Sequence, residues 1–146
     1  MHRFSLYCIC CLMASVGSGA AAAKDSLAGP LRAEVIRVVD GDTLDVRAHI
    51  WIGQHIETRV RLNQIDTPEL RGKCPAEKKR AQEAKQALIG LTQTHYVVLK
   101  NIQYGKYAGR VLADVETLTG NNLSALLIEK GLAKPYDGGK RSNWCG

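Results

Sequence analysis

The sequence predicts an α+β domain that is mostly β: a five-stranded barrel with two or three helices packed on its side. Three observations lead to this prediction. Three strand-like segments follow one another between residues 33 and 65 with only short turns between them, an amphipathic helix comes next, and two more strand-like segments precede a short final helix. Because no helix separates the first three strands, we expect them to form an antiparallel meander.

Length and composition agree with one globular domain. The chain has 146 residues, of which 45% are hydrophobic and 23% are charged, and these values exclude wholesale disorder and a collagen-like repeat. Lys and Arg number 20 against 14 Asp and Glu, which gives a net charge of +6. This excess favours an anionic partner, namely nucleic acid, an acidic glycan or a membrane surface.

Residues 1–23 have the order of a secretory signal. A short basic start at Arg3 precedes an apolar run over Phe4–Val16, and small residues follow up to Ala23, where we expect cleavage. The alternative is a membrane anchor, but Gly, Ser and Ala in the second half make a weak span. We therefore expect an exported protein, periplasmic or secreted, with no stable membrane anchor after cleavage. A flexible lead-in over 24–32 would precede a domain over 33–146.

The first three strands are expected at Val35–Val39, Thr43–Ile52 and Ile56–Ile65. The turn Asp40–Asp42 joins the first two, because Gly adopts unusual dihedrals and Asp side chains bond the local backbone. Gly53-Gln54 forms the second turn. Alternation in the third strand places its apolar residues on one face and its arginines on the other.

The remaining elements follow from helical stripes and two further apolar runs. A helix begins near Pro75, which suits a first turn, and buries one stripe. That stripe consists of Ala81, Ala84, Leu88 and Leu91. Strands are expected at Tyr96–Ile102 and Arg110–Glu116. A final helix carries Leu123, Leu126, Leu127 and Ile128, with Asn121 or Asn122 as its cap and Gly131 at its end, and an irregular tail follows over Asp137–Gly146.

This order of strands and helices is that of a small barrel of the OB type. Such barrels often bind oligonucleotides in their grooves. The fold alone does not assign a function, which has to be argued from particular side chains.

Two cysteines remain after removal of the signal. Of the five cysteines, three lie within residues 1–23, and the others are Cys74 and Cys145. An even pair in an exported chain predicts a disulfide, and the alternative is two unrelated thiols. A metal site is disfavoured because neither cysteine has a second Cys or a His nearby at zinc spacing.

Acidic residues at the ends of two expected strands have the chemistry of a metal site. Asp42 and Asp66 offer hard oxygen ligands, which together with backbone carbonyls and water suit Ca²⁺. Glu69, three residues after Asp66, could act as a general base on a water molecule beside that metal. The alternatives are a plain turn at residues 40–43 and a helix cap at residues 66–69.

Two arginines complete an inventory for phosphodiester hydrolysis. Arg61 and Arg110 carry planar, permanent charges that suit a phosphate whose negative charge grows in the transition state. Each could instead be a solvated or salt-bridged surface side chain. Acids, a base and two arginines together favour metal-assisted hydrolysis.

Four motifs in order carry a family resemblance: VIRVVDGDTLDV, RLNQIDTPE, YAGRVLADV and ALLIEKGLAKPY. Together they resemble the thermonuclease (staphylococcal-nuclease-like) family over Glu34–Tyr136. The resemblance implies an OB barrel with helices and a Ca²⁺-dependent phosphodiesterase, an endonuclease that cuts DNA and RNA.

The resemblance also implies roles for particular residues. Arg61 would hold and neutralise the phosphate, Glu69 would activate water, and Arg110 would stabilise the pentacoordinate state. Asp42 and Asp66 would bind Ca²⁺ through their side chains, and the backbone carbonyl of Thr67 would be a third ligand. Asp40 would support this cluster.

The chain departs from the family pattern near Arg110. Gly105 stands where the family has an acidic residue, and Ala108 is an extra residue that displaces Tyr107. Tyr107 and Tyr136 are therefore candidate nucleotide contacts out of register. We also infer that a Cys74–Cys145 bridge would tie the tail beside the active-site loop.

Three functional hypotheses remain open at this point. The first is an exported Ca²⁺-dependent nuclease with low sequence preference, acting as a monomer on DNA and RNA. The second is a barrel that binds nucleic acid without catalysis, for which Glu69 and both arginines would be unnecessary. The third is a module for another polyanion, which would leave residues 40–43 and 66–69 unexplained.

Overall fold

The computed structural model describes residues 25–146. The predicted signal at residues 1–23 lies outside the described residues. Two helices and eight strands make up the described part of the chain. The strands are β1 (Ser26–Leu27), β2 (Leu31–Asp40), β3 (Thr43–Trp51), β4 (Gln54–Leu62), β5 (Ile65–Asp66), β6 (Tyr96–Tyr104), β7 (Arg110–Thr117) and β8 (Lys134–Pro135), and the helices are α1 (Pro75–Leu91) and α2 (Leu123–Glu129).

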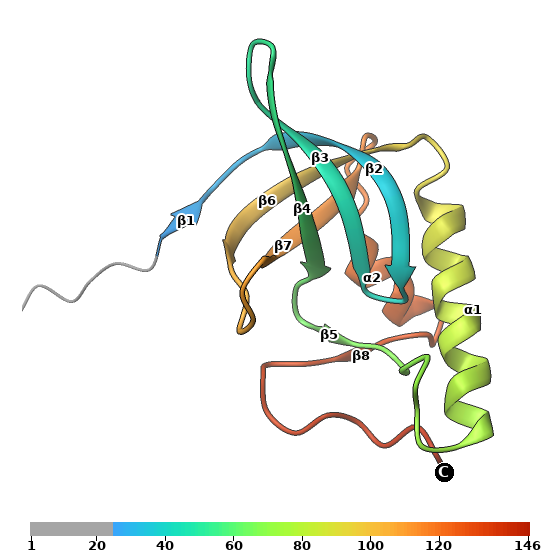
Figure 1. Cartoon of the computed structure of the whole chain (residues 1–146). Helices are drawn as coiled ribbons and strands as arrows, with labels where there is room; N and C mark the ends of the chain where they lie inside the picture. Colours follow the sequence, from blue (N-terminus) through green and yellow to red (C-terminus); the bar gives the residue numbers. More distant parts are fainter. Residues whose placement is uncertain (1–24) are drawn as a thin grey trace, which may run out of the picture.

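Five of these strands close into a barrel. β2 pairs antiparallel with both β3 and β6, β3 pairs antiparallel with β4, and β6 pairs antiparallel with β7. The parallel pairing of β4 with β7 completes the ring (Figure 1). The predicted class, a five-stranded OB-type barrel with helices at its side, is therefore confirmed.

Strand alternation fills the barrel with aliphatic side chains. Val, Leu and Ala from each of the five strands are fully buried, as expected of a chain with a single Phe. The interior residues include Val35, Leu44, Val46, Val60, Leu62, Val97, Leu99, Ala113 and Val115. The opposite side chains of each strand face outward, and this outer face carries the arginines of β4 and β7.

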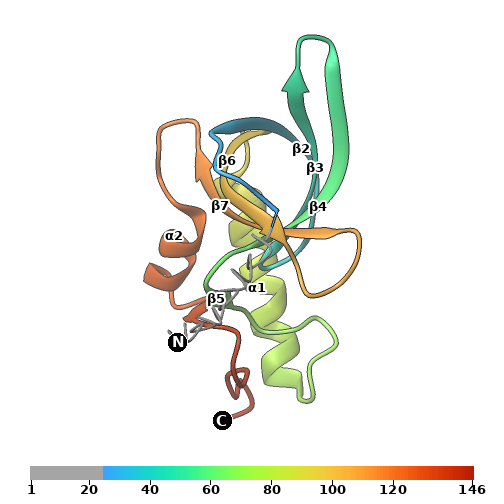
Figure 2. The same cartoon turned by 90° about the vertical axis from the view of Figure 1, so that its left-hand side faces the viewer.

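The two helices cover one side of the barrel (Figures 1 and 2). Helix α1 begins at the predicted Pro75, takes Cys74 as its N-cap, and buries Ala81, Ala84 and Leu88. Helix α2 is capped by Asn122, whose side chain accepts a hydrogen bond from the Ala125 amide. None of the helices between residues 25 and 146 is long and apolar enough to cross a membrane.

Two expected elements differ from the structure. The strand expected over Ile56–Ile65 ends at Leu62, because Gln64 adopts a left-handed backbone with φ of 62°. The chain then forms β5, which pairs with β8 near the other end of the sequence. In the expected flexible lead-in, Ser26 and Leu27 pair with β6, so this segment is joined to the sheet.

The hairpin of β3 and β4 projects beyond the barrel, at the end away from the Asp40–Asp42 turn (Figure 1). Its tip exposes Trp51 at 76% and Ile52 at 90%. The Asp40–Asp42 turn and β5 lie at the other end of the barrel (Figure 1), where Gly41 approaches Ala84 in the middle of α1.

Candidate functional site

The turn between β2 and β3 presents a buried carboxylate. Asp42 is only 2% exposed, and its Oδ2 lies 2.5 Å from Nη1 of Arg61 on the neighbouring strand. Its Oδ1 accepts a hydrogen bond from the Thr43 hydroxyl at 2.8 Å. Arg61 also donates from Nη2 to the Ile65 carbonyl, at 3.1 Å. The structure thus brings the predicted metal ligand Asp42 and the predicted catalytic Arg61 into direct contact.

Burial makes Asp42 an unusual acid. Loss of solvation raises its pKa to about 6, and the charge of Arg61 opposes this rise only in part. The neighbouring carboxyl of Asp40 adds to the increase, and Asp40 also accepts a hydrogen bond from the Asp42 amide at 3.2 Å. Asp40 therefore lies beside Asp42, where we predicted a supporting role.

Close packing explains the glycine in this turn. We predicted that Gly41 supplies an unusual backbone conformation, but it is not among the glycines with positive φ. A Cβ at this position would lie 2.7 Å from the Ala84 side chain and 3.2 Å from Oγ1 of Thr67. Gly41 is therefore needed because α1 and the segment after β5 approach the turn so closely.

The second predicted carboxylate is held by the C-terminal segment. Asp66 is 1% exposed, and its Oδ1 accepts a hydrogen bond from Nε of Arg141 at 2.7 Å. Its Oδ2 accepts from the Ser142 amide at 3.0 Å and from the Trp144 indole at 3.3 Å. Nη2 of Arg141 donates to the Thr67 carbonyl at 3.0 Å.

Glu69 lies in the loop between β5 and α1, and its side chain is half exposed. Its carboxylate forms an ion pair with Nη1 of Arg141. Glu77, in the first turn of α1, holds the loop by accepting hydrogen bonds from the amides of Glu69 and Lys73. Gly72 leaves room for this side chain, since a Cβ would lie 2.5 Å from Glu77 and would force it to move.

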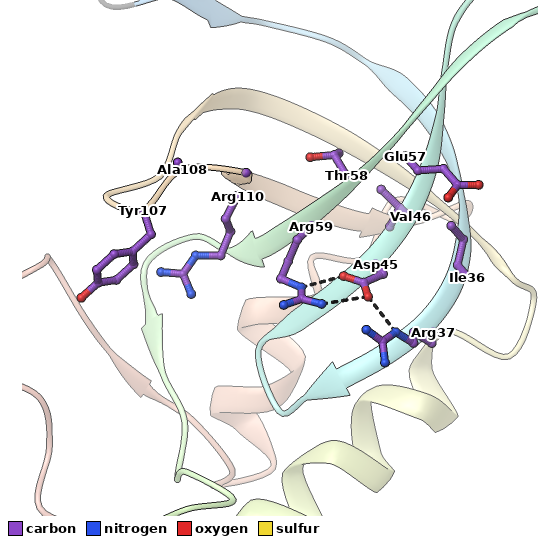
Figure 3. Close-up of a pocket in the computed structure, with 11 residues that line it drawn as sticks. Ile36, Arg37, Asp45, Val46, Glu57, Thr58, Arg59, Tyr107, Ala108 and Arg110 are labelled. Atoms are coloured by element: carbon purple, nitrogen blue, oxygen red, sulfur yellow. Dashed lines mark hydrogen bonds and ion pairs between the residues drawn. The ribbon is translucent and has the colours of Figure 1, made fainter.

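Arg110 lines an open groove on the outer face of the barrel, together with Tyr107, Arg59, Arg37 and Asp45 (Figure 3). Its guanidinium carbon lies 5.1 Å from the centre of the Tyr107 ring. Among the residues that the structure describes, its buried Nε has no hydrogen-bond partner. A buried donor without an acceptor is costly, and nothing among the described residues offsets this cost.

Asp45 forms ion pairs with the other two arginines of this groove. It accepts two hydrogen bonds from Arg59, at 2.7 and 3.0 Å, and one from Arg37 at 2.7 Å. The bonds from Arg59 are the main reason that the pKa of Asp45 lies below its usual value. Arg110 is the arginine of the groove that forms no ion pair with the described carboxylates.

Strand register relates the two predicted catalytic arginines. In the parallel pairing of β4 and β7, Arg59 lies opposite Arg110, and Arg61 lies two residues further along β4. Residues two apart on a strand share a face, so Arg61 and Arg110 are diagonal neighbours on the outside of the barrel.

Tyr136 lies in a different groove. That groove is lined by Arg61, Gln64 and Tyr136, and the Tyr136 hydroxyl donates to the Gly139 carbonyl at 2.9 Å. Tyr107 and Tyr136 are thus on separate grooves that adjoin Arg110 and Arg61 respectively.

The predicted site residues form two clusters around two arginines. Asp42 contacts Arg61, whereas Asp66, Thr67 and Glu69 all contact Arg141. Within residues 25–146, the carboxylates of Asp42, Asp66 and Glu69 do not form a group whose oxygens lie within 4.8 Å of one another.

The group that meets this distance is Cys74, Glu77 and Cys145, but its two cysteines are joined in a disulfide and are not available to a metal. The predicted Cys74–Cys145 bridge is thus present, with the two Cα atoms 5.9 Å apart. It ties the tail beside the loop that carries Glu69, because Cys74 ends that loop.

Residues of the tail form the part of the site that the sequence analysis missed. Arg141, Ser142 and Trp144 contact Asp66 across more than 70 positions of sequence. No local pattern marks such a contact. The available signal was Cys145, whose predicted pairing brings the whole segment to the loop.

Comparisons with known proteins agree with this architecture. The family model described as staphylococcal nuclease homologue matches residues 59–143. The chain is 32% identical over 113 residues to protein ParB of Escherichia coli, and 33% identical over 112 residues to micrococcal nuclease of Shigella flexneri. These matches cover 73% and 72% of this chain, and 58% of each relative's length. The chain belongs to the family of staphylococcal nuclease homologues, as the sequence motifs predicted.

Proposed function

We propose that this protein is a Ca²⁺-dependent nuclease that hydrolyses phosphodiester bonds of DNA and RNA with little sequence preference. Membership of the family and similarity to a micrococcal nuclease support hydrolysis of nucleic acid. The observation that carries the proposal is the pair of arginines on the outer face of β4 and β7. Arg110 lines an open groove and forms no ion pair with the described carboxylates, and a phosphate is the anion that suits its guanidinium.

The oxygens at the end of the barrel fit a hard divalent cation. The carboxylates of Asp42 and Asp66 are buried, and the carbonyl of Thr67 follows directly in the chain. Carboxylate and carbonyl oxygens are the ligands that Ca²⁺ prefers. A bound Ca²⁺ would supply positive charge beside the phosphate.

The protein's own residues would divide the remaining work. Glu69 accepts a proton from the attacking water, whose oxygen forms a bond to phosphorus while the bond to the leaving oxygen breaks. Arg61 neutralises the phosphate, and Arg110 stabilises the extra negative charge of the pentacoordinate state. The net positive charge of the chain adds affinity for nucleic acid that falls as salt rises.

We also propose that the protein is exported and acts as a monomer. What supports export is the signal-like order of residues 1–23 together with the disulfide, since structural disulfides are typical of oxidising compartments. Reduced and oxidised fractions of the purified protein, separated on a gel after thiol labelling, would measure how much of it carries the bridge.

Digestion of single-stranded DNA at fixed salt tests the activity. The protein is assayed with Ca²⁺ and with EDTA, beside the Glu69→Gln variant. We expect cleavage only with Ca²⁺ and a loss of about 100- to 10,000-fold in turnover for Glu69→Gln. Little change in the melting temperature is expected, because the Glu69 side chain is half exposed.

Two results would contradict the proposal. Binding without cleavage under every metal tried would favour the non-catalytic barrel, and the extra Ala108 beside Arg110 would then be examined first. An unchanged rate in Glu69→Gln would remove the general-base role while leaving the nuclease in place.

A further inference from the structure

The C-terminal segment over residues 139–146 places a cation among the predicted metal ligands. The guanidinium of Arg141 donates to Oδ1 of Asp66 at 2.7 Å and to the Thr67 carbonyl at 3.0 Å. It also forms an ion pair with Glu69. One side chain therefore contacts two predicted Ca²⁺ ligands and the predicted general base: Nε and Nη2 contact Asp66, Nη2 contacts the Thr67 carbonyl and Nη1 contacts Glu69.

A guanidinium and a divalent cation seek the same oxygens. The guanidinium of Arg presents several donors in a planar arrangement that matches the geometry of a carboxylate, and each nitrogen of Arg141 contacts an oxygen in this way. Ca²⁺ needs its oxygen ligands at 2.3–2.6 Å, in a sphere that closes around the ion. A guanidinium that spans the Asp66 side chain, the Thr67 carbonyl and Glu69 fills the space between them, so the two cations exclude each other.

The position of Arg141 is fixed from both sides. Cys145, four residues later, is bonded to Cys74 at the start of α1. Trp144 is almost fully buried, its indole donates to Oδ2 of Asp66, and the ammonium of Lys134 lies 4.3 Å from its ring centre. These anchors keep Arg141 at a high effective concentration beside the carboxylates.

We propose that Arg141 is a tethered competitor of the divalent cation, an autoinhibitory contact that lowers the affinity of this site for Ca²⁺. The inference rests on the proposed function, because it takes Asp66 and Thr67 as ligands of that cation. Binding of Ca²⁺ would displace the guanidinium from Asp66 and Thr67 and release the Glu69 carboxylate at the same time. The cation concentration would thus control whether the general base is free.

Direct measurement of Ca²⁺ binding by calorimetry tests this competition, on the oxidised protein and without substrate. Arg141→Gln removes the guanidinium, and Lys140→Gln is the matched control. Lys140 is the adjacent residue, is exposed and forms no ion pair with the described acids. Its replacement by Gln changes the net charge by the same amount as Arg141→Gln does. We expect Arg141→Gln to bind Ca²⁺ at least about tenfold more tightly than the wild type, a typical size for coupled sites. Lys140→Gln should stay within about twofold of the wild type, as for a screened surface charge.

A second readout reports where the cation binds. Tb³⁺ has the same preference for oxygen ligands, and the Trp144 indole next to Asp66 would sensitise its luminescence. Arg141→Gln should lower the Tb³⁺ concentration needed for half-maximal emission by the same factor. Arg141→Lys keeps the positive charge but lacks the planar guanidinium. We expect its half-maximal Tb³⁺ concentration to lie between those of the wild type and Arg141→Gln, and this conservative variant controls for a folding defect.

The outcomes separate this inference from the proposed function. Equal or weaker Ca²⁺ affinity in Arg141→Gln, with Ca²⁺-dependent cleavage in the wild type, overturns the competition alone. A protein that binds neither Ca²⁺ nor Tb³⁺ in any variant overturns the competition and the Ca²⁺ site together. Tighter binding in Arg141→Gln and not in Lys140→Gln supports the competition.

Discussion

Two aspartates three residues apart, Asp42 in the turn before β3 and Asp45 within β3, are used very differently by the fold. Asp45 faces outward and is held by Arg59 and Arg37, whereas Asp42 lies at the turn, buried against Arg61. The pKa of Asp45 lies below its usual value because of the Arg59 hydrogen bonds, and the pKa of Asp42 is raised to about 6 because of burial. Each aspartate has an arginine partner, so burial decides the direction of the shift.

The two regions also differ in how they are assembled. The outer cluster of Asp45 uses three neighbouring strands of one meander, and its partners lie within 14 positions of sequence. The buried end of the barrel needs the turn at Asp42, β5 and a tail that meets Asp66 from 75 positions away. The outer pairs resemble ordinary surface ion pairs. A buried carboxylate needs a cationic partner, and Arg141 of the tail is that partner for Asp66.

The largest expected effect separates two arginines of β4. Arg61→Gln should reduce turnover by about 100- to 1,000-fold, the range for loss of a charge-stabilising donor, because Arg61 belongs to the buried cluster. Arg59→Gln should change turnover by less than about tenfold, since its guanidinium is already held by Asp45. Initial rates on single-stranded DNA with Ca²⁺ measure both variants.

Comparable losses of turnover in the two variants would contradict the different roles expected of Arg61 and Arg59. They would place Arg59, which lines the groove beside Arg110, in direct contact with the nucleic acid.

The next effect concerns the bridge that holds the tail against the buried cluster. Cys145→Ser opens a loop with a sequence separation of 71, which costs about 4 kcal/mol in the chain-entropy model. We expect a lower melting temperature than the wild type under oxidising conditions and an equal one under reducing conditions. Thermal melts with and without reductant give this comparison.

A wild type that melts at the same temperature with and without reductant would show that the bridge contributes nothing to stability. In that case the Trp144 and Arg141 contacts would hold the tail by themselves.

The smallest effect is the pH dependence of the two aspartates in metal-free protein. Because the pKa of Asp42 is raised, the folded state holds its proton more tightly, and stability falls as pH rises from about 4 to 6. Asp42→Asn should remove this fall. The difference in the free energy of unfolding between the variant and the wild type should therefore shift in favour of the variant by no more than about 3 kcal/mol between pH 4 and pH 7. Urea unfolding in EDTA at the two pH values measures the gain.

Asp45→Asn, three residues along the chain, is the matched control. Because its pKa is lowered, Asp45 stabilises the fold above its unfolded pKa and loses that contribution as pH falls below about 4. The variant should cost less than about 1 kcal/mol at pH 7, as for other exposed ion pairs, and its difference from the wild type should not change between pH 5 and pH 7. A pH-dependent difference in that range would mean that Asp45 shares the environment of Asp42.

Local patterns were enough to predict most of the fold. Alternation gave the strands of the meander, and Pro75 with the Ala and Leu stripe gave α1, because these signals depend on near neighbours in the chain. The strand expected to run to Ile65 ends earlier, because Gln64 has a left-handed backbone; its carbonyl accepts a hydrogen bond from the amide of the distant Tyr136, next to β8. A short-range pattern holds no information about that partner.

The amino-acid sequence alone was enough to predict the barrel, the bridge between Cys74 and Cys145, and the residues of the candidate site. Tertiary structure decided which charges meet. It buried Asp42 against Arg61, left Arg110 in its groove without an ion pair to the carboxylates of residues 25–146, and brought Arg141 to Asp66. Burial and distant contacts set the energy of a charge, and both exist only once the chain has folded.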